Sequence, residues 1–141
     1  MSATSQQSNE DVVRTCLTEA SRGNYDVFGT ILTPSYVVHP DEARGAAGLQ
    51  AMVDGYRAAL SDLRVDIEQQ FSAGDRVATV STIRGVHEGE LMGTAPTGRE
   101  VAFAMITISR FEDGRIAEEW EIADTASLLA QIGALPVPAH S

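Results

Sequence analysis

The chain has 141 residues, of which 43% are hydrophobic, and its formal net charge is −10. This length suits one domain with a real core, and the negative charge argues against nucleic acid and anionic membranes, since both attract basic patches. The single cysteine, Cys16, excludes an intrachain disulfide. Residues 1–8 are polar and no segment resembles a signal peptide or a membrane span, so we expect a cytoplasmic protein.

Residues 8–136 are expected to form a single domain, with loose ends at 1–7 and 137–141. Its first half is mostly helical, because apolar residues recur there at helical spacing. We predict one helix from Ser8 to Gly23, a short one over 26–32 that Pro34 stops, and a third that opens at Gly45. A short strand over 36–39 lies between the second and third helices.

After residue 60 the hydrophobic period changes to two, which indicates strands. These are predicted over 63–67, 76–87, 101–111 and 116–123, followed by a last helix over 125–132. Helices first and a meander afterwards indicate an α+β fold. We expect a cone-shaped, curved antiparallel sheet with the N-terminal helices packed on its concave face, enclosing one pocket.

The sequence Glu112-Asp113-Gly114 joins the last two strands and fits two hairpin registers. A three-residue loop places Met105 opposite Glu121, so that Glu121 lies on the apolar face. A two-residue turn of Asp113 and Gly114 instead places Asp124 on that face.

Three stretches resemble motifs of the SnoaL-like polyketide cyclases: 85–99 (GVHEGELMGTAPTGR), 110–121 (RFEDGRIAEEWE) and 128–136 (LLAQIGALP). The resemblance runs from about Val12 to Pro136. It implies the pocketed cone of the nuclear-transport-factor-two-like superfamily. It also implies ring closure of a polyketide ester by an intramolecular aldol reaction, with no metal or organic cofactor. Relatives of the same fold open epoxides, form cyclic ethers, assist hydroxylation or only bind ligands, and these functions stay as alternatives.

The resemblance further implies a catalytic acid directly after the hairpin tryptophan. The family commonly reads E-H-W-D where this chain has Glu118-Glu119-Trp120-Glu121, so Glu121 takes the position of the acid, and this match favours the three-residue loop. Thr107 stands near a position that is often His or Asp in the family, and it can form a hydrogen bond without carrying a proton. Histidines are frequent at the sites of His39 and His87.

One buried carboxylate can remove a proton next to a carbonyl group and later protonate the new alkoxide. Glu121 is the first candidate for this role, Asp124 the second, and His39 and His87 are further catalytic candidates. The alternative for Glu121 is an ordinary exposed strand glutamate. The substrate-binding candidates are Phe103, Met105, Thr107, Tyr36, Tyr56, Trp120 and Met92.

The expected partner is a small hydrophobic, polyketide-like substrate. His39, His87 and His140 are scattered without metal-ligand spacing, and no glycine-rich phosphate loop follows a strand, so we expect no metal and no cofactor. Residues 101–108 are apolar on both alternating faces. One face can line the pocket, and we expect a homodimer, or a tetramer, to cover the other.

Overall fold

The computed structural model describes residues 3–134, so the predicted loose end at 137–141, with His140, lies outside the described residues. The elements follow in the order α1 (Ala3–Ser21), α2 (Phe28–Ile31), β1 (Leu32–His39), β2 (Ala43–Arg44), α3 (Gly45–Ala59), β3 (Leu60–Ala73), β4 (Arg76–His87), β5 (Glu100–Glu112), β6 (Arg115–Ala123) and α4 (Thr125–Gln131).

The strand predicted over 63–67 is much longer, since β3 spans Leu60–Ala73, and two further departures lie near the N-terminus. Helix α1 begins at Ala3, five residues before the predicted start at Ser8. Pro34 lies inside β1 and does not stop a helix; it is exposed, and the pairing of β1 is irregular between Leu32 and Val37. Proline is tolerated there because an irregular part of a strand needs no ladder hydrogen bond from it.

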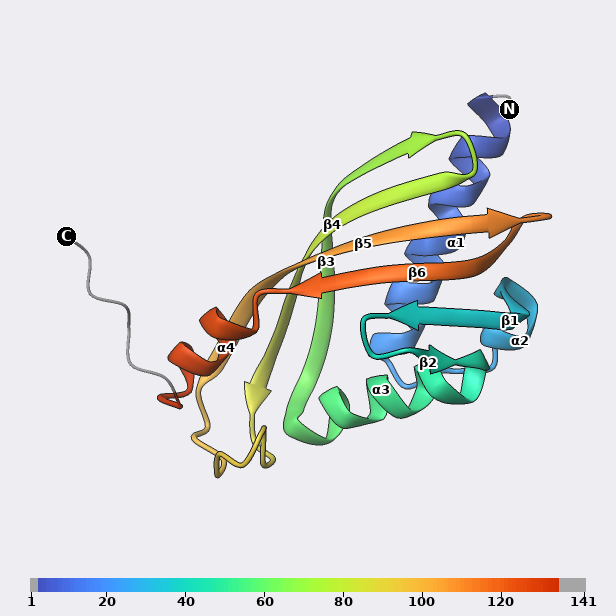
Figure 1. Ribbon diagram of the computed structural model, residues 1–141. Coiled ribbons are helices and arrows are strands. Elements are labelled where there is room, and N and C mark those ends of the chain that lie inside the picture. Colours follow the sequence, from blue (N-terminus) through green and yellow to red (C-terminus); the bar gives the residue numbers. More distant parts are fainter. Residues whose placement is uncertain (1–2, 135–141) are drawn as a thin grey trace.

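Six strands form one curved, unclosed sheet in the order β2-β1-β6-β5-β4-β3. Strands β3 to β6 pair antiparallel, as predicted, whereas β1 pairs parallel with β6, which the sequence analysis did not foresee. Helix α1 packs on β3 and β4, and α3 packs on β1 and β3 (Figure 1). This confirms the predicted α+β cone with its helices on the concave face.

The hairpin between β5 and β6 closes through a two-residue turn, so the predicted three-residue loop is wrong. Glu112 pairs with Arg115, and Asp113 and Gly114 have φ of 51° and 79°, as a type I′ turn requires. The register then shifts, because Phe111 pairs with Ile116 but Arg110 pairs with Glu118.

Ala117 is therefore an extra residue in β6, and both it and Ile116 are buried. Such a β-bulge reverses the alternation of every residue that follows it. As a result Thr107 pairs with Glu121, and Glu121 lies on the concave face although the turn has two residues.

Candidate active site

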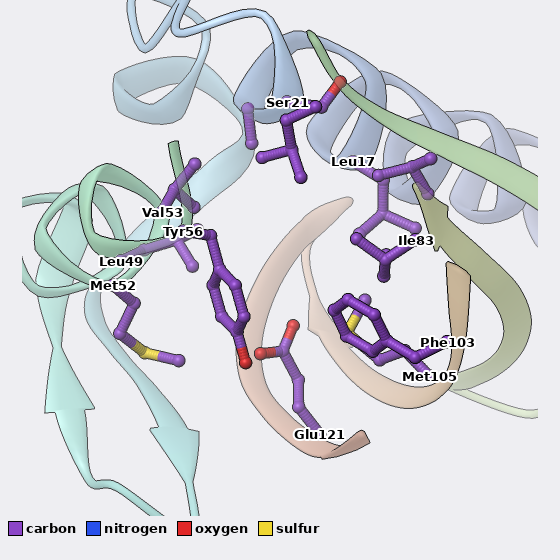
Figure 2. Close-up of a pocket in the computed structure, with 13 residues that line it drawn as sticks. Leu17, Ser21, Leu49, Met52, Val53, Tyr56, Ile83, Phe103, Met105 and Glu121 are labelled. Atoms are coloured by element: carbon purple, nitrogen blue, oxygen red, sulfur yellow. The ribbon is translucent and has the colours of Figure 1, made fainter. Parts of the chain in front are cut away.

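An apolar inner cavity of about 80 Å³ lies between α1, α3 and the concave face of the sheet (Figure 2). Among its lining residues only Ser21, Tyr56 and Glu121 carry a polar group. Leu17 comes from α1, Met52 from α3 and Phe103 from β5. Among the described residues the lining consists of Leu17, Ala20, Ser21, Leu49, Met52, Val53, Tyr56, Leu63, Val65, Ile83, Phe103, Met105 and Glu121.

A wider outer cavity of about 620 Å³ adjoins the inner one. The two share four residues: Met52, Tyr56, Met105 and Glu121. The outer cavity is also bordered by Asp41 and by Glu90 to Met92 of the β4–β5 loop, so it is the more polar of the two. One pocket was expected from the sequence, and the structure has a small apolar cavity that shares part of its wall with a larger one. Glu121 lies at their junction.

The surroundings of Glu121 favour its neutral form. Burial raises the pKa of its carboxyl group to about 8, and the nearby negative charges of Glu119 and Asp41 act in the same direction. A carboxyl group with this pKa exchanges protons near neutral pH, where acid–base catalysis is most effective.

Tyr56 of α3 is the second polar group at the junction. Figure 2 shows its hydroxyl and the carboxyl group of Glu121 pointing into the same space. Burial raises the pKa of Tyr56, and the charge of Glu121 raises it further, so the phenol stays protonated and can donate a hydrogen bond. Its ring stacks on Phe103 with 6.3 Å between the ring centroids, which fixes its direction.

Glu119 lies on the same face of β6 as Glu121, and it is buried. Its two oxygens accept hydrogen bonds from the hydroxyl of Tyr36 and from that of Ser109, both at 2.6 Å. Burial raises the pKa of Glu119 above its ordinary value, and the two donated hydrogen bonds offset part of that rise. Tyr36 is fully buried in this contact and does not line either cavity.

Of the other residues predicted for the β5 wall, Phe103 and Met105 line the inner cavity. Thr107 is fully buried beside Glu121 and lines neither cavity, so its hydroxyl does not reach the space where a substrate would bind.

His39 and Trp120 belong to the opposite face of the sheet. Trp120 pairs with Ile108, which is exposed, and with His39 of β1. The imidazole of His39 stacks on Trp120 with 5.6 Å between centroids, and its Nε2 lies 2.7 Å from Oε2 of Glu118. The guanidinium of Arg76 lies 5.0 Å from the centre of the Trp120 ring. His39 borders the outer cavity, but its ring contacts Trp120 and Glu118 and not Glu121.

His87 is buried at the end of β4 and lines neither cavity. Its Nδ1 lies 3.0 Å from the hydroxyl of Thr97, and its backbone bonds Gly98 and Arg99. It therefore anchors the far end of the loop that carries Met92, which is exposed at the outer cavity.

Asp124 is exposed and caps α4, since its side chain accepts a hydrogen bond of 3.0 Å from the backbone N–H of Ser127. A two-residue turn without a bulge would place Asp124 on the apolar face. The bulge in β6 reverses that alternation, so Asp124 is not the buried acid.

On the helical side of the cavities only Tyr56 was predicted from the sequence, and the role of Glu119 was not foreseen. Leu49, Met52 and Val53 recur at helical spacing, which does not distinguish lining residues from packing residues. Glu119 had a readable signal, because residues two apart in a strand share a face.

Residues 3–134 contain neither a cluster of metal-ligating side chains nor a helix suited to cross a membrane. No three histidine, cysteine, aspartate or glutamate residues in this part lie close enough together to hold a metal ion. None of the described helices is both long and apolar enough to cross a membrane.

The chain belongs to the SnoaL-like polyketide cyclase family, whose model matches residues 10–132. Searching the curated proteins gave no match.

Several solved structures share the fold. IdmH from Streptomyces antibioticus, a proposed polyketide cyclase, is 29% identical, with a TM-score of 0.78 over 89% of this chain and 98% of that one. TsrD from Streptomyces laurentii is 25% identical, with a TM-score of 0.84 over 96% and 99%. AclR from Streptomyces galilaeus, a proposed hydroxylase, is 24% identical, with a TM-score of 0.84 over 95% and 90%.

Proposed function

We propose that this protein is a cofactor-independent cyclase or lyase that acts on a hydrophobic, carbonyl-bearing molecule of the polyketide type, with Glu121 as its general acid and base. The observation that carries the proposal is the position of Glu121, the one carboxyl group that lines the apolar inner cavity. Membership of the SnoaL-like family and the likeness to IdmH support a cyclase-type reaction.

The proposed reaction is an aldol ring closure. Ionised Glu121 removes a proton from the carbon next to one carbonyl group, and the resulting enolate forms a carbon–carbon bond with a second carbonyl carbon of the same molecule. Glu121 then returns the proton to the new alkoxide oxygen, so nothing is oxidised or reduced. With a pKa of about 8, roughly one carboxyl group in ten is ionised at pH 7, and that fraction is a stronger base than an ordinary glutamate.

The neighbouring groups would bind and orient the substrate. The phenol of Tyr56 can donate a hydrogen bond to the enolate oxygen as its charge develops. Phe103 and Met105 form an apolar wall, and the narrow inner cavity accepts a compact apolar end while the outer one holds the body of the molecule. The chain contains no lysine, so an imine route to the same bond is not open to it.

The test uses benzylacetone, a small hydrophobic methyl ketone, in deuterated water. Wild-type protein should exchange the protons next to the carbonyl group for deuterium, as followed by proton NMR. Glu121→Gln keeps the size and polarity of the side chain but holds no transferable proton. It should slow the exchange by about 100-fold or more, the range for a lost acid–base group.

The matched control is Glu118→Gln, which makes the same substitution three residues earlier on the opposite face. It should leave the exchange unchanged, as should treatment of the protein with EDTA. Binding of benzylacetone with no exchange in the wild type would reject the enzymatic proposal and favour a ligand-binding module.

A further inference from the structure

Glu119 and Glu121 carry neighbouring carboxyl groups on the concave face of β6; Glu119 is buried and Glu121 is half-buried. Residues two apart on a strand are separated by about 6.6 Å along it and point the same way. Glu119 is 3% exposed, and none of the ion pairs in the described part of the chain includes either residue. Two negative charges this close, one of them buried and without a cation beside them, repel each other, so the pair tends to keep one proton.

The hydrogen bonds around the pair are unequal. Both oxygens of Glu119 accept from hydroxyl groups, those of Tyr36 and Ser109, and such an arrangement suits a carboxylate, which can only accept. No hydrogen bond from the described residues reaches the carboxyl group of Glu121, which lines the two cavities instead. The charge is therefore better stabilised on Glu119 and the proton is better placed on Glu121.

The other groups around the pair do not offset this charge. Those that can titrate are Cys16 of α1, Tyr36 of β1, Asp41 between β1 and β2, and Tyr56 of α3. None of these side chains can carry a positive charge. Strand β5 faces the pair with the uncharged hydroxyls of Thr107 and Ser109.

We infer that Glu119 is a positioning residue, held as a carboxylate by Tyr36 and Ser109, that keeps the shared proton on Glu121. It lines neither cavity and does not meet the substrate. The catalytic consequence rests on the proposed function, because Glu119 acts through Glu121, but the placement of the proton is a property of the free protein.

The experiment follows the side-chain carboxyl carbons of glutamate by NMR while the pH of the ligand-free, carbon-13-labelled protein is changed. The signal of Glu121 is identified by its loss in Glu121→Gln, and its midpoint is expected near pH 8. Glu119→Gln removes the charge but can still form hydrogen bonds with both hydroxyls. It should lower the midpoint of Glu121 by about one to two pH units, as expected for two charges about 7 Å apart at an effective dielectric constant of about 20.

The control is again Glu118→Gln, which should leave the midpoint of Glu121 in place. An unchanged midpoint in Glu119→Gln would overturn the inference. If that variant does not fold, Tyr36→Phe serves instead. It removes one donor to Glu119 and should move part of the proton onto Glu119, so that the Glu121 signal shifts toward its ionised position near neutral pH; an unmoved signal overturns the inference.

The outcomes separate the two proposals. A shifted midpoint together with no exchange of benzylacetone in the wild type would support the role of Glu119 and reject the proposed enzyme. Where exchange does occur, its pH profile should move with the titration of Glu121 in Glu119→Gln, which a purely structural defect would not produce.

Discussion

Thr107 of β5 lies directly opposite Glu121 of β6, and within the described part of the chain its buried hydroxyl oxygen has no hydrogen-bond partner. A buried hydroxyl in this condition costs about 1–3 kcal/mol. Thr79, the neighbour of Thr107 on β4, differs, because its hydroxyl accepts a hydrogen bond of 3.3 Å from Gln70. The two threonines therefore provide a matched comparison.

Thr107→Val should leave the free energy of unfolding unchanged or raise it by about 1 kcal/mol, since valine keeps the shape and removes the unpaired hydroxyl. Thr79→Val should lower it by about 1 kcal/mol through the lost hydrogen bond. Urea unfolding of both variants gives the comparison. A greater loss for Thr107→Val than for Thr79→Val would show that the Thr107 hydroxyl is bonded in solution.

The raised pKa of Glu121 makes stability depend on pH. Its folded-state pKa of about 8 exceeds the ordinary value of 4.5, so between these two pH values the folded protein binds more protons than the unfolded chain. The stabilising contribution is complete below about pH 4.5 and is lost as the pH rises through 8.

Glu121→Gln removes this dependence. The variant should gain about 2–4 kcal/mol of stability relative to wild type on going from pH 5 to pH 9, as measured by urea unfolding at both pH values. Glu118→Gln is the control, because His39 and Arg110 lower the pKa of Glu118, so its stabilising contribution is lost only as the pH falls below the ordinary value of 4.5, outside the range compared. A constant difference between Glu121→Gln and wild type would contradict the prediction.

Asp124 is expected to matter for stability and not for turnover. Asp124→Ala deletes the N-cap of α4 and should lower the free energy of unfolding by about 1 kcal/mol, while exchange of benzylacetone stays at the wild-type rate. Asp124→Asn, which retains a capping oxygen, should preserve most of the stability. A large loss of exchange in Asp124→Asn would place Asp124 in the reaction after all.

The outer face of the sheet is expected to pair with a second copy of the chain. Ile106, Ile108 and Ile122 lie together on it with 47%, 37% and 74% of their surface exposed. Ile122→Lys should convert a dimer into a monomer, as measured by light scattering at micromolar concentration. Met92→Lys also replaces an exposed apolar side chain by lysine, but in the β4–β5 loop, and should leave the dimer intact. A wild-type monomer would reject this prediction.

Most of the fold could be predicted, because hydrophobic period and turn residues mark elements locally. The predicted strand over 76–87 coincides with β4, and the helix that opens at Gly45 begins there. The parallel pairing of β1 with β6 could not be predicted, since a long-range pairing leaves no local pattern.

The candidate site was harder to predict than the fold. The type I′ turn at Asp113-Gly114 followed local turn chemistry, and the family match had favoured a longer loop. The bulge at Ala117 leaves no clear trace in the sequence, because two consecutive apolar residues such as Ile116 and Ala117 also occur in strands without a bulge. The predicted face of Glu121 was therefore correct although the predicted turn was wrong. A three-residue loop and a two-residue turn followed by a bulge give the same alternation of faces to the residues that follow.

Without the bulge at Ala117, β6 would pair with β5 in a register shifted by one residue. If Ala117 paired with Arg110, the residues after it would exchange faces, so that Trp120 and Ile122 turned toward the helices and Glu119 and Glu121 toward solvent. Hydrophobicity alone favours this slipped strand, whereas Tyr36 and Ser109 hold the native one through Glu119. A refolding chain that closes the turn first must select between the two, and Trp120, the only tryptophan in the sequence, would report its choice through its fluorescence.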